Sequence, residues 1–198
     1  MKKLTTVIVL ATLFTPLIAS AELSYDAAQL SYERMSQSGK RDLNMTNFNL
    51  SKGITNNVFL DGKYGTGKQA TGTSFGDATA KEWAIGAGYH TPIQTNTDFI
   101  ITGRFRKVTA TVAGTSSTGD SRILGLGIRT EITPQFEGSL GASYVSSSVG
   151  SSTTTATSVN GELGFKVTPQ FQLIAGLGYL SAGSNPTHSI DIGVRFFY

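Results

Sequence analysis

The sequence predicts an all-β protein whose antiparallel strands close into an up-and-down barrel that spans a membrane. Three observations lead to this fold class. A short apolar leader opens the chain, apolar residues then alternate with polar residues or glycine, and a Thr-Pro motif recurs after 35 residues. No apolar run after residue 21 has the length of a transmembrane helix, so a membrane-spanning chain of this kind must cross with strands.

The first 21 residues have the composition of a cleaved signal peptide. Lys2 and Lys3 form a basic region, an apolar stretch follows, and Ala19-Ser20-Ala21 is the small-x-small pattern that signal peptidase accepts. We therefore expect a signal peptide over 1–21 and one barrel domain over 22–198. Removal of the two lysines lowers the net charge from +3 to +1. The remaining basic residues form no cluster, which argues against nucleic-acid binding.

The clearest strand is the last one. Five apolar residues fall on one face, because successive side chains of a strand point to opposite sides. They are Ile190, Ile192, Val194, Phe196 and Tyr198. Apolar residues toward lipid and polar residues or glycine toward the lumen are typical of a transmembrane barrel strand. The same alternation recurs over 83–90, 98–105, 124–129, 136–144, 159–167 and 171–180.

The repeated motif indicates the number of strands. Thr133-Pro134-Gln135-Phe136 returns as 168–171, and the segment 91–93 resembles a looser third copy. In each copy a strand ends, proline closes a tight turn and the next strand begins. One hairpin in 35 residues predicts ten strands, with eight as the alternative if a weakly patterned early hairpin is lost. The expected strands are 23–37, 41–52, 56–69, 80–93, 96–112, 120–132, 135–148, 155–167, 170–181 and 187–198.

The expected connections are of two kinds. The Thr-Pro turns and the 52–57 link are short, whereas 68–81, 112–121 and 146–157 are longer and rich in Gly, Ser and Thr. This asymmetry is usual between the periplasmic and extracellular ends of a barrel. We expect residues 146–158 to form a mobile loop. Aromatic residues suited to two membrane girdles are Tyr89, Phe136, Phe171 and Tyr198 at one level, and Trp83, Phe105, Tyr144 and Tyr179 at the other.

The predicted inward faces carry most of the charge. Opposite charges should pair across the interior, because an unpaired buried charge is costly. The residues concerned are Asp98, Arg104, Arg106, Arg129, Glu131, Glu137, Glu162, Lys166, Asp191 and Arg195. Two interpretations stay open: a salt-bridged interior that fills a narrow barrel, or a charge-lined conduit in which inward glycines leave a water path. Those glycines are Gly86, Gly88, Gly125, Gly127, Gly176 and Gly178.

The sequence does not favour an enzyme. It has no Cys and two distant His, His90 and His188, so we expect no catalytic, metal or cofactor site. Ser189 is adjacent to His188, but neighbouring strand residues point to opposite faces.

The leader, the alternating strands, the Thr-Pro turns and the aromatic last strand resemble the small Gram-negative outer-membrane barrels of the OmpA-like and OmpX/Ail-like kind. The last ten residues, 189–198, are similar to the C-terminal signal that periplasmic chaperones and the barrel assembly machinery read. The resemblance implies a monomer in the outer membrane, in contact with its lipid and with lipopolysaccharide. That group usually has eight strands, so the repeat, which favours ten, departs from it.

The leading interpretation of function is a non-enzymatic barrel with a structural or envelope role, extending to a narrow channel for small solutes or ions. The alternative is a surface-binding, adhesin-like barrel that acts through its Ser/Thr/Gly-rich extracellular loops.

Overall fold

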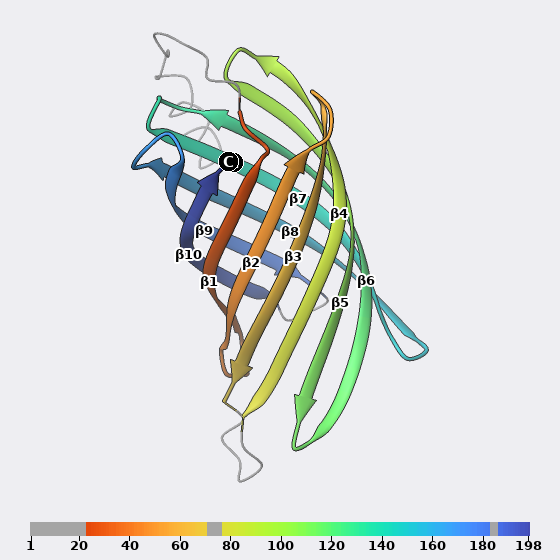
Figure 1. The fold of residues 1–198 in the computed structure, drawn as a ribbon. Helices are drawn as coiled ribbons and strands as arrows, with labels where there is room; N and C mark the ends of the chain where they lie inside the picture. The colour runs from red at the N-terminus through yellow and green to blue at the C-terminus, as the bar shows by residue number, and fades with distance from the viewer. Residues whose placement is uncertain (1–22, 71–76, 183–185) are drawn as a thin grey trace, which may run out of the picture.

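Ten antiparallel strands form one closed barrel in the computed structural model (Figure 1). The structure describes residues 23–70, 77–182 and 186–198, so the expected signal peptide over 1–21 lies outside it. Each strand pairs with its neighbours in the sequence, and the first pairs with the last. The prediction of ten strands is confirmed, and the alternative of eight is wrong. The strands are β1 (Ala27–Gln37), β2 (Leu43–Gly53), β3 (Val58–Gln69), β4 (Ala78–Gln94), β5 (Thr97–Val112), β6 (Thr115–Glu131), β7 (Phe136–Val149), β8 (Ser152–Lys166), β9 (Phe171–Ser181) and β10 (Thr187–Phe197).

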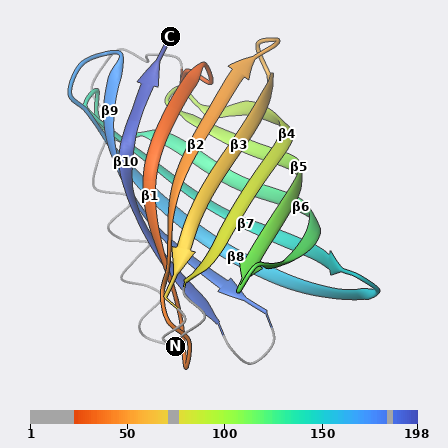
Figure 2. The same ribbon diagram turned by 60° about the horizontal axis from the view of Figure 1, so that its bottom comes forward.

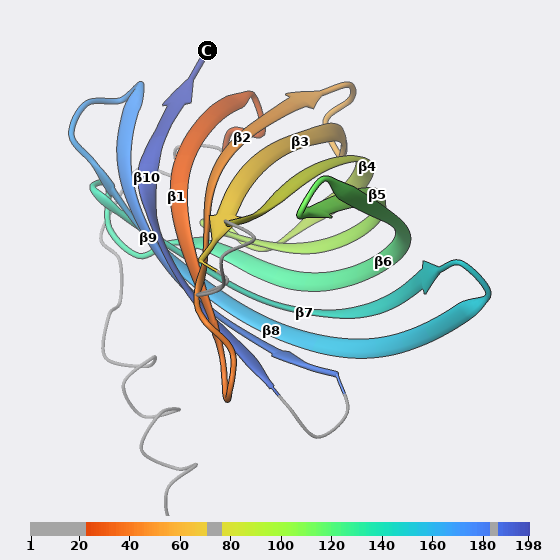
Figure 3. The same cartoon turned by 90° about the horizontal axis from the view of Figure 1, so that it is seen from below.

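Two hairpins are longer than the sequence predicts. The expected loops 112–121 and 146–157 are almost entirely strand, because only residues 113–114 and 150–151 connect β5 to β6 and β7 to β8. A glycine in each turn has a φ of 81° or 58°, which glycine adopts without a Cβ clash. The hairpin of β7 and β8 consequently projects sideways from the ring of strands (Figure 3).

Hydroxyl groups join the strands of these two hairpins. Thr111 and Ser116 share a hydrogen bond of 2.8 Å, and Ser148 and Thr153 share one of 3.1 Å. Threonine favours extended backbone because it is β-branched, and its hydroxyl pairs across the ladder. The prediction of a mobile loop over 146–158 is therefore wrong, since Ser and Thr build a ribbon there.

The two Thr-Pro motifs build the same turn. In the first copy, the Phe136 backbone N–H donates both to the Thr133 carbonyl and to the Thr133 hydroxyl, each at 3.0 Å. In the second copy, Phe171 N–H makes the same pair of bonds to Thr168, at 3.2 and 3.0 Å. Threonine is thus the residue that closes each turn, ahead of the proline.

The third copy of this turn is not the segment that contains a proline. Ile54 and Thr55 both donate from their backbone N–H to the Val58 carbonyl, and Val58 N–H donates to the Thr55 hydroxyl at 3.0 Å. The looser third copy at 91–93 does not itself close a turn, because β4 runs on through those residues to Gln94 with a register shift. The connection follows at 95–96, close to the gap between the expected strands 80–93 and 96–112. The shared signal is an Ile or Val followed by Thr, which precedes all three turns.

The seam between β1 and β10 is reinforced beyond the strands. The Tyr198 backbone N–H donates to the Asp26 carbonyl at 3.3 Å, and the Tyr198 hydroxyl donates to the Ser51 carbonyl at 2.9 Å. The Lys52 ammonium lies 2.5 Å from the Asp26 carboxylate. Hydrogen bonds from Lys52 and from the Gly53 N–H lower the pKa of Asp26, so the carboxylate stays charged.

The barrel has two distinct ends. We call the end that holds Tyr198 and the turns 54–57, 95–96, 132–135 and 167–170 the short-turn end, and the opposite one the hairpin end. The strands are tilted relative to the barrel axis, as the oblique view shows (Figure 2), and the view from below shows the ring that they form (Figure 3). None of the described residues forms a helix long and apolar enough to cross a membrane.

The apolar packing inside the barrel is small and lies near the short-turn end. Leu23, Tyr25 and Phe59 are buried together, and Ile100 packs against them. The Phe59 ring lies over Gly88 of the neighbouring strand, where a Cβ atom would overlap it. Gly88 therefore provides the space that the ring fills, rather than the water path that a conduit would need.

We expect Gly88→Ala to destabilise the barrel by about 1–3 kcal/mol, because the added methyl group displaces the Phe59 ring. Unfolding in urea in detergent or lipid measures the change. Gly103→Ala is the matched control, since nothing lies within 4 Å of a Cβ there, and its stability should change by less than about 1 kcal/mol. Equal effects of the two variants would contradict this packing role.

Candidate functional site

The segment that precedes β1 lies inside the short-turn end of the barrel. Tyr25 is buried, and its ring stacks on His90 with centroids 3.9 Å apart and on Phe59 at 4.8 Å. The Ser24 carbonyl accepts a hydrogen bond of 2.7 Å from Arg129 on β6. The segment therefore occupies part of the lumen at the short-turn end, whereas the sequence predicts that residues 23–26 begin the first strand.

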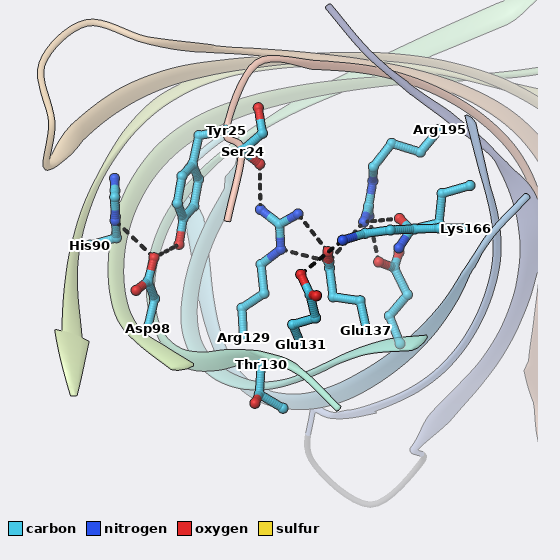
Figure 4. Close-up of polar contacts among 12 residues, drawn as sticks. Ser24, Tyr25, His90, Asp98, Arg129, Thr130, Glu131, Glu137, Lys166 and Arg195 are labelled. Atoms are coloured by element: carbon cyan, nitrogen blue, oxygen red, sulfur yellow. Dashed lines mark hydrogen bonds and ion pairs between the residues drawn. The ribbon is translucent and has the colours of Figure 1, made fainter. Parts of the chain in front are cut away.

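Asp98 joins this segment to the wall. Its Oδ2 atom accepts a hydrogen bond of 2.8 Å from the Tyr25 hydroxyl and lies 2.9 Å from His90 Nδ1 (Figure 4). All three side chains are buried. A buried carboxylate needs such partners, because burial without them carries a large desolvation cost. Asp98, predicted as a lumen charge, thus holds the Tyr25 side chain in place.

Arg129 lies next to Tyr25 and spans the middle of the lumen. Its guanidinium donates to both carboxylate oxygens of Glu137, at 2.6 and 3.0 Å, which is the paired geometry that favours Arg over Lys. The same group lies 5.1 Å from the centre of the Tyr25 ring, within the range of a cation–π contact. Arg129 therefore links the inserted segment to the ion pairs of β6 and β7.

The ion pairs continue around the wall. Arg195 pairs with Glu137 and Glu162 and donates to the Gln172 and Gln29 side-chain oxygens at 2.9 and 2.8 Å. Lys166 lies 2.9 Å from Glu131. Figure 4 shows Arg195, Lys166 and Glu137 lying across the interior of the barrel. We call Arg129, Arg195, Lys166, Glu131, Glu137 and Glu162 the ion-pair cluster.

The ion-pair cluster is balanced in charge, with three cations and three carboxylates. Its members sit within a few residues of the short-turn ends of their strands, except Glu162, which lies deeper. Together with Tyr25, the ion-pair cluster occupies part of the interior at that end.

A second group of polar contacts packs the interior of β1 to β4. The Lys63 ammonium lies 2.5 Å from Glu82 and 3.9 Å from Glu33, and Asn47 donates to Glu33 at 2.9 Å. Met45 is buried beside them. Glu82 was missed by the sequence reasoning, although its place two residues before an inward alanine in β4 matches the alternation.

The other side of the barrel is hollow. A cavity of about 570 Å³ extends from Tyr25, Arg129 and Glu137 at the short-turn end toward Arg106 and Val145 farther along the strands. Small side chains of β6 to β8 line it, including Ser143, Ser158 and several glycines. Tyr25, the ion-pair cluster and the polar contacts of β1 to β4 thus occupy part of the lumen, and the cavity remains between them and the inner faces of β5 to β8. A second pocket, of about 450 Å³, lies at the short turns and is lined by residues that include Asn57, His90 and Asn96.

The ten predicted lumen charges all lie on the inner face, and the structure brings together only some of them. Six form the ion-pair cluster, and Asp98 holds Tyr25. Arg104 Nε donates to Asp61 at 2.8 Å. Within the described part of the chain, Arg106 and Asp191 form no ion pair. The carboxylate of Asp191 instead occupies the space above Gly176.

The residues predicted as a C-terminal assembly signal lie on the outer face of β10 or just beyond it. Ile190, Ile192 and Phe196 are exposed there, Val194 is half-buried, and Tyr198 follows the strand. Phe171 packs against Phe196 with ring centroids 6.3 Å apart. The outer face of β10 therefore forms a continuous apolar and aromatic surface with the outer face of β9.

The two histidines lie in different surroundings, His90 in the interior and His188 on the outer face. His90 has Asp98 and the Tyr25 ring as neighbours, and no hydroxyl group of the described residues hydrogen-bonds to it. His188 lies on the outer face of β10 and packs against the Tyr179 ring at 5.2 Å. The described residues also hold no group of three or more His, Cys, Asp or Glu placed to bind a metal ion.

Comparison with known proteins identifies the fold. No family model and no curated protein matches the sequence. The β-domain of the Bordetella autotransporter BrkA is similar in structure, with a TM-score of 0.62, 10% identity, and 87% of this chain and 98% of that chain covered. The translocator domain of the autotransporter NalP from Neisseria meningitidis gives a TM-score of 0.51, 9% identity, and 87% of each chain. At these identities the likeness shows the outer-membrane β-barrel fold alone.

We expect Arg129→Met to destabilise the barrel by about 3–5 kcal/mol, because it removes a partner of buried Glu137 and the contact with the inserted segment. Arg34→Met is the matched control, since Arg34 makes an exposed ion pair with Asp42 and its loss should cost less than about 1 kcal/mol. Urea unfolding of both variants measures the difference. A cost for Arg129→Met no larger than that of the control would show that the ion-pair cluster contributes little.

Proposed function

We propose that the protein spans the outer membrane of a Gram-negative bacterium as a non-enzymatic barrel with a structural role in the envelope. The observation that carries the proposal is the outer face, on which every strand exposes large apolar side chains. A continuous apolar surface of this kind is a liability in water and is stable against lipid. Examples from opposite sides of the ring are Leu50, Ile85, Leu126, Leu140 and Ile192.

The positions of the aromatic side chains support the same environment. Phe136 packs on Phe165 at 5.1 Å near the short-turn end, and Trp83 packs on Phe105 at 5.6 Å farther along the strands. Aromatic rings favour the headgroup level on each side of a membrane. The proposed surroundings are outer-membrane lipid and lipopolysaccharide, around a single copy of the chain. Periplasmic chaperones and the barrel assembly machinery would recognise β10.

The side chains that cross the lumen at the short-turn end favour a structural barrel over a channel. Tyr25, Arg129 and Arg195 lie across the lumen there, and each is held by several polar contacts. A steady ion path would have to displace these groups. A narrow channel for small solutes or ions is therefore the weaker form of the proposal.

We expect the protein to fractionate with the outer membrane and to form no steady conducting steps in a planar lipid bilayer. Tyr25→Ala should produce small steps, because it removes the ring that fills the space beside Arg129. Tyr64→Ala, which removes a ring from the outer face, should produce no conducting steps. Different migration of boiled and unboiled samples on a detergent gel confirms folding. Discrete conductance of the wild type would favour the channel, and recovery in the periplasmic fraction would refute the membrane proposal.

A second candidate function is surface binding, and the hairpin of β7 and β8 favours it. This hairpin projects from the barrel and presents exposed Thr153, Thr154 and Thr155 on an ordered ribbon (Figure 3). Replacing residues 146–155 by Asn-Gly would leave the pair Val145–Ala156 joined by a two-residue turn. We expect bacteria with this variant to adhere less to cell-coated surfaces. Unchanged adherence with normal surface display would remove this candidate.

A further inference from the structure

We propose that the cavity beside β5 to β8 binds a small oxyanion, such as a carboxylate or a phosphate, through the guanidinium of Arg106, with Arg104 as the second contact. The inference goes beyond the structural role, because it assigns a ligand class to the open part of the lumen. It starts from the charge balance of the cavity wall.

Every carboxylate that lines the cavity already has a cationic partner. Asp61 pairs with Arg104, Glu137 with Arg129 and Arg195, and Glu162 with Arg195. Lys63, which also lines it, pairs with Glu82 on the inner face of β4. Arg106 is the cation that remains. Among the described residues it makes one polar contact, a long hydrogen bond of 3.4 Å to the Ser121 hydroxyl.

The donors of Arg106 are poorly satisfied. Its Nε–H is buried and has no acceptor within hydrogen-bond distance among the described residues. The Ser121 hydroxyl is itself engaged with Ser147 at 2.9 Å, so it is a shared partner. A guanidinium carries five donors in a planar fork, and an oxyanion supplies two acceptors that match this fork. A bound oxyanion would therefore provide the acceptors that the wall lacks.

Arg104 lies two residues from Arg106 on the same inner face of β5, about 7 Å away along the strand. Only its Nε is engaged, by Asp61, and 42% of the side chain is exposed in the interior. The other nitrogens of Arg104 are free to donate within the described structure. Two guanidinium groups on one face thus adjoin the same hollow.

The wall formed by β7 and β8 offers polar groups to a ligand, and its two carboxylates, Glu137 and Glu162, are each paired with a guanidinium. Ser143 and Ser158 share a hydrogen bond of 2.7 Å, and Asn160 lies on the same wall. A volume of about 570 Å³ is in the range of small-molecule sites. The cavity therefore has room for an organic acid or a phosphate ester, with its anionic group at Arg106.

The test uses the full mature barrel, folded in detergent micelles and labelled with ¹⁵N-arginine. Titration with sodium phosphate or sodium acetate, at ionic strength held constant with sodium chloride, should shift the side-chain Nε–H signal of Arg106 and reach saturation. Arg106→Gln removes that signal and identifies it. In the same variant, the affinity for the anion, measured from the saturable shift of the Arg104 signal, should fall about tenfold or more, because hydrogen bonds to a charged group are lost.

Arg122→Gln is the matched control, since Arg122 is exposed on the outer face of β6, and it should bind like the wild type. Arg106→Lys keeps the charge without the fork and should bind with intermediate affinity. Arg106→Lys also serves as the test variant in the case that Arg106→Gln does not fold. A folded wild type that shows no saturable shift would overturn the proposal. So would Arg106 variants that bind the anion with the affinity of the wild type, or an Arg122→Gln variant that loses as much affinity as Arg106→Gln. An equal response to chloride alone would also overturn it.

Discussion

Closure of the sheet between β1 and β10 is the constraint on which the other features depend. Residues 27–37 pair with 187–197 in one continuous antiparallel register. Without this pairing, two strands would present unpaired N–H and C=O groups, each of which costs several kcal/mol in hydrocarbon. Closure also fixes which alternate side chains face inward. The apolar exterior and the charged interior are both consequences of that single register.

A closed, narrow lumen requires its polar groups to satisfy one another. The ion-pair cluster does so with equal numbers of opposite charges. The fully buried Gln172 accepts from Arg195 through its amide oxygen, whereas its amide nitrogen has no partner among the described residues. Inward glycines take part in this packing. Gln172 lies over Gly164, and Asp191 lies over Gly176, so these glycines are sites that a neighbouring side chain fills. Beside β5 to β8, neighbouring side chains do not fill the space in this way, and the cavity remains.

The sequence predicted the fold well because alternation is a local property. Apolar positions such as Ile190 and Ile192 identify a strand and its outer face without knowledge of its neighbours. Turn positions were harder. Proline marked two turns correctly and misled at 91–93, whereas the Thr55 hydroxyl closed a turn that has no proline. The long hairpins were missed because Ser- and Thr-rich segments are equally suited to a loop and to a ladder of hydroxyl pairs.

The inner face of each strand could be predicted from the same alternation, but the contacts within it could not. Arg129 and Glu137 are close in sequence, yet Arg195 and Gln29 are separated by 166 residues. Which charges meet depends on strand tilt and side-chain reach, and neither is encoded in the period of two. Tyr25 was missed for another reason, because the expected first strand, 23–37, included it, whereas β1 begins only at Ala27.

The contacts of Arg195 also bear on how assembly ends. Contacts between segments so distant in the chain form late and slowly in folding. A slip of one residue between β10 and β1 would turn Arg195 to the outside, where its charge would face lipid. The same slip would separate it from Gln29, Gln172 and Glu137. The interior network thus discriminates against misregistered closure, and a barrel in which this network has formed is one whose first and last strands have met correctly.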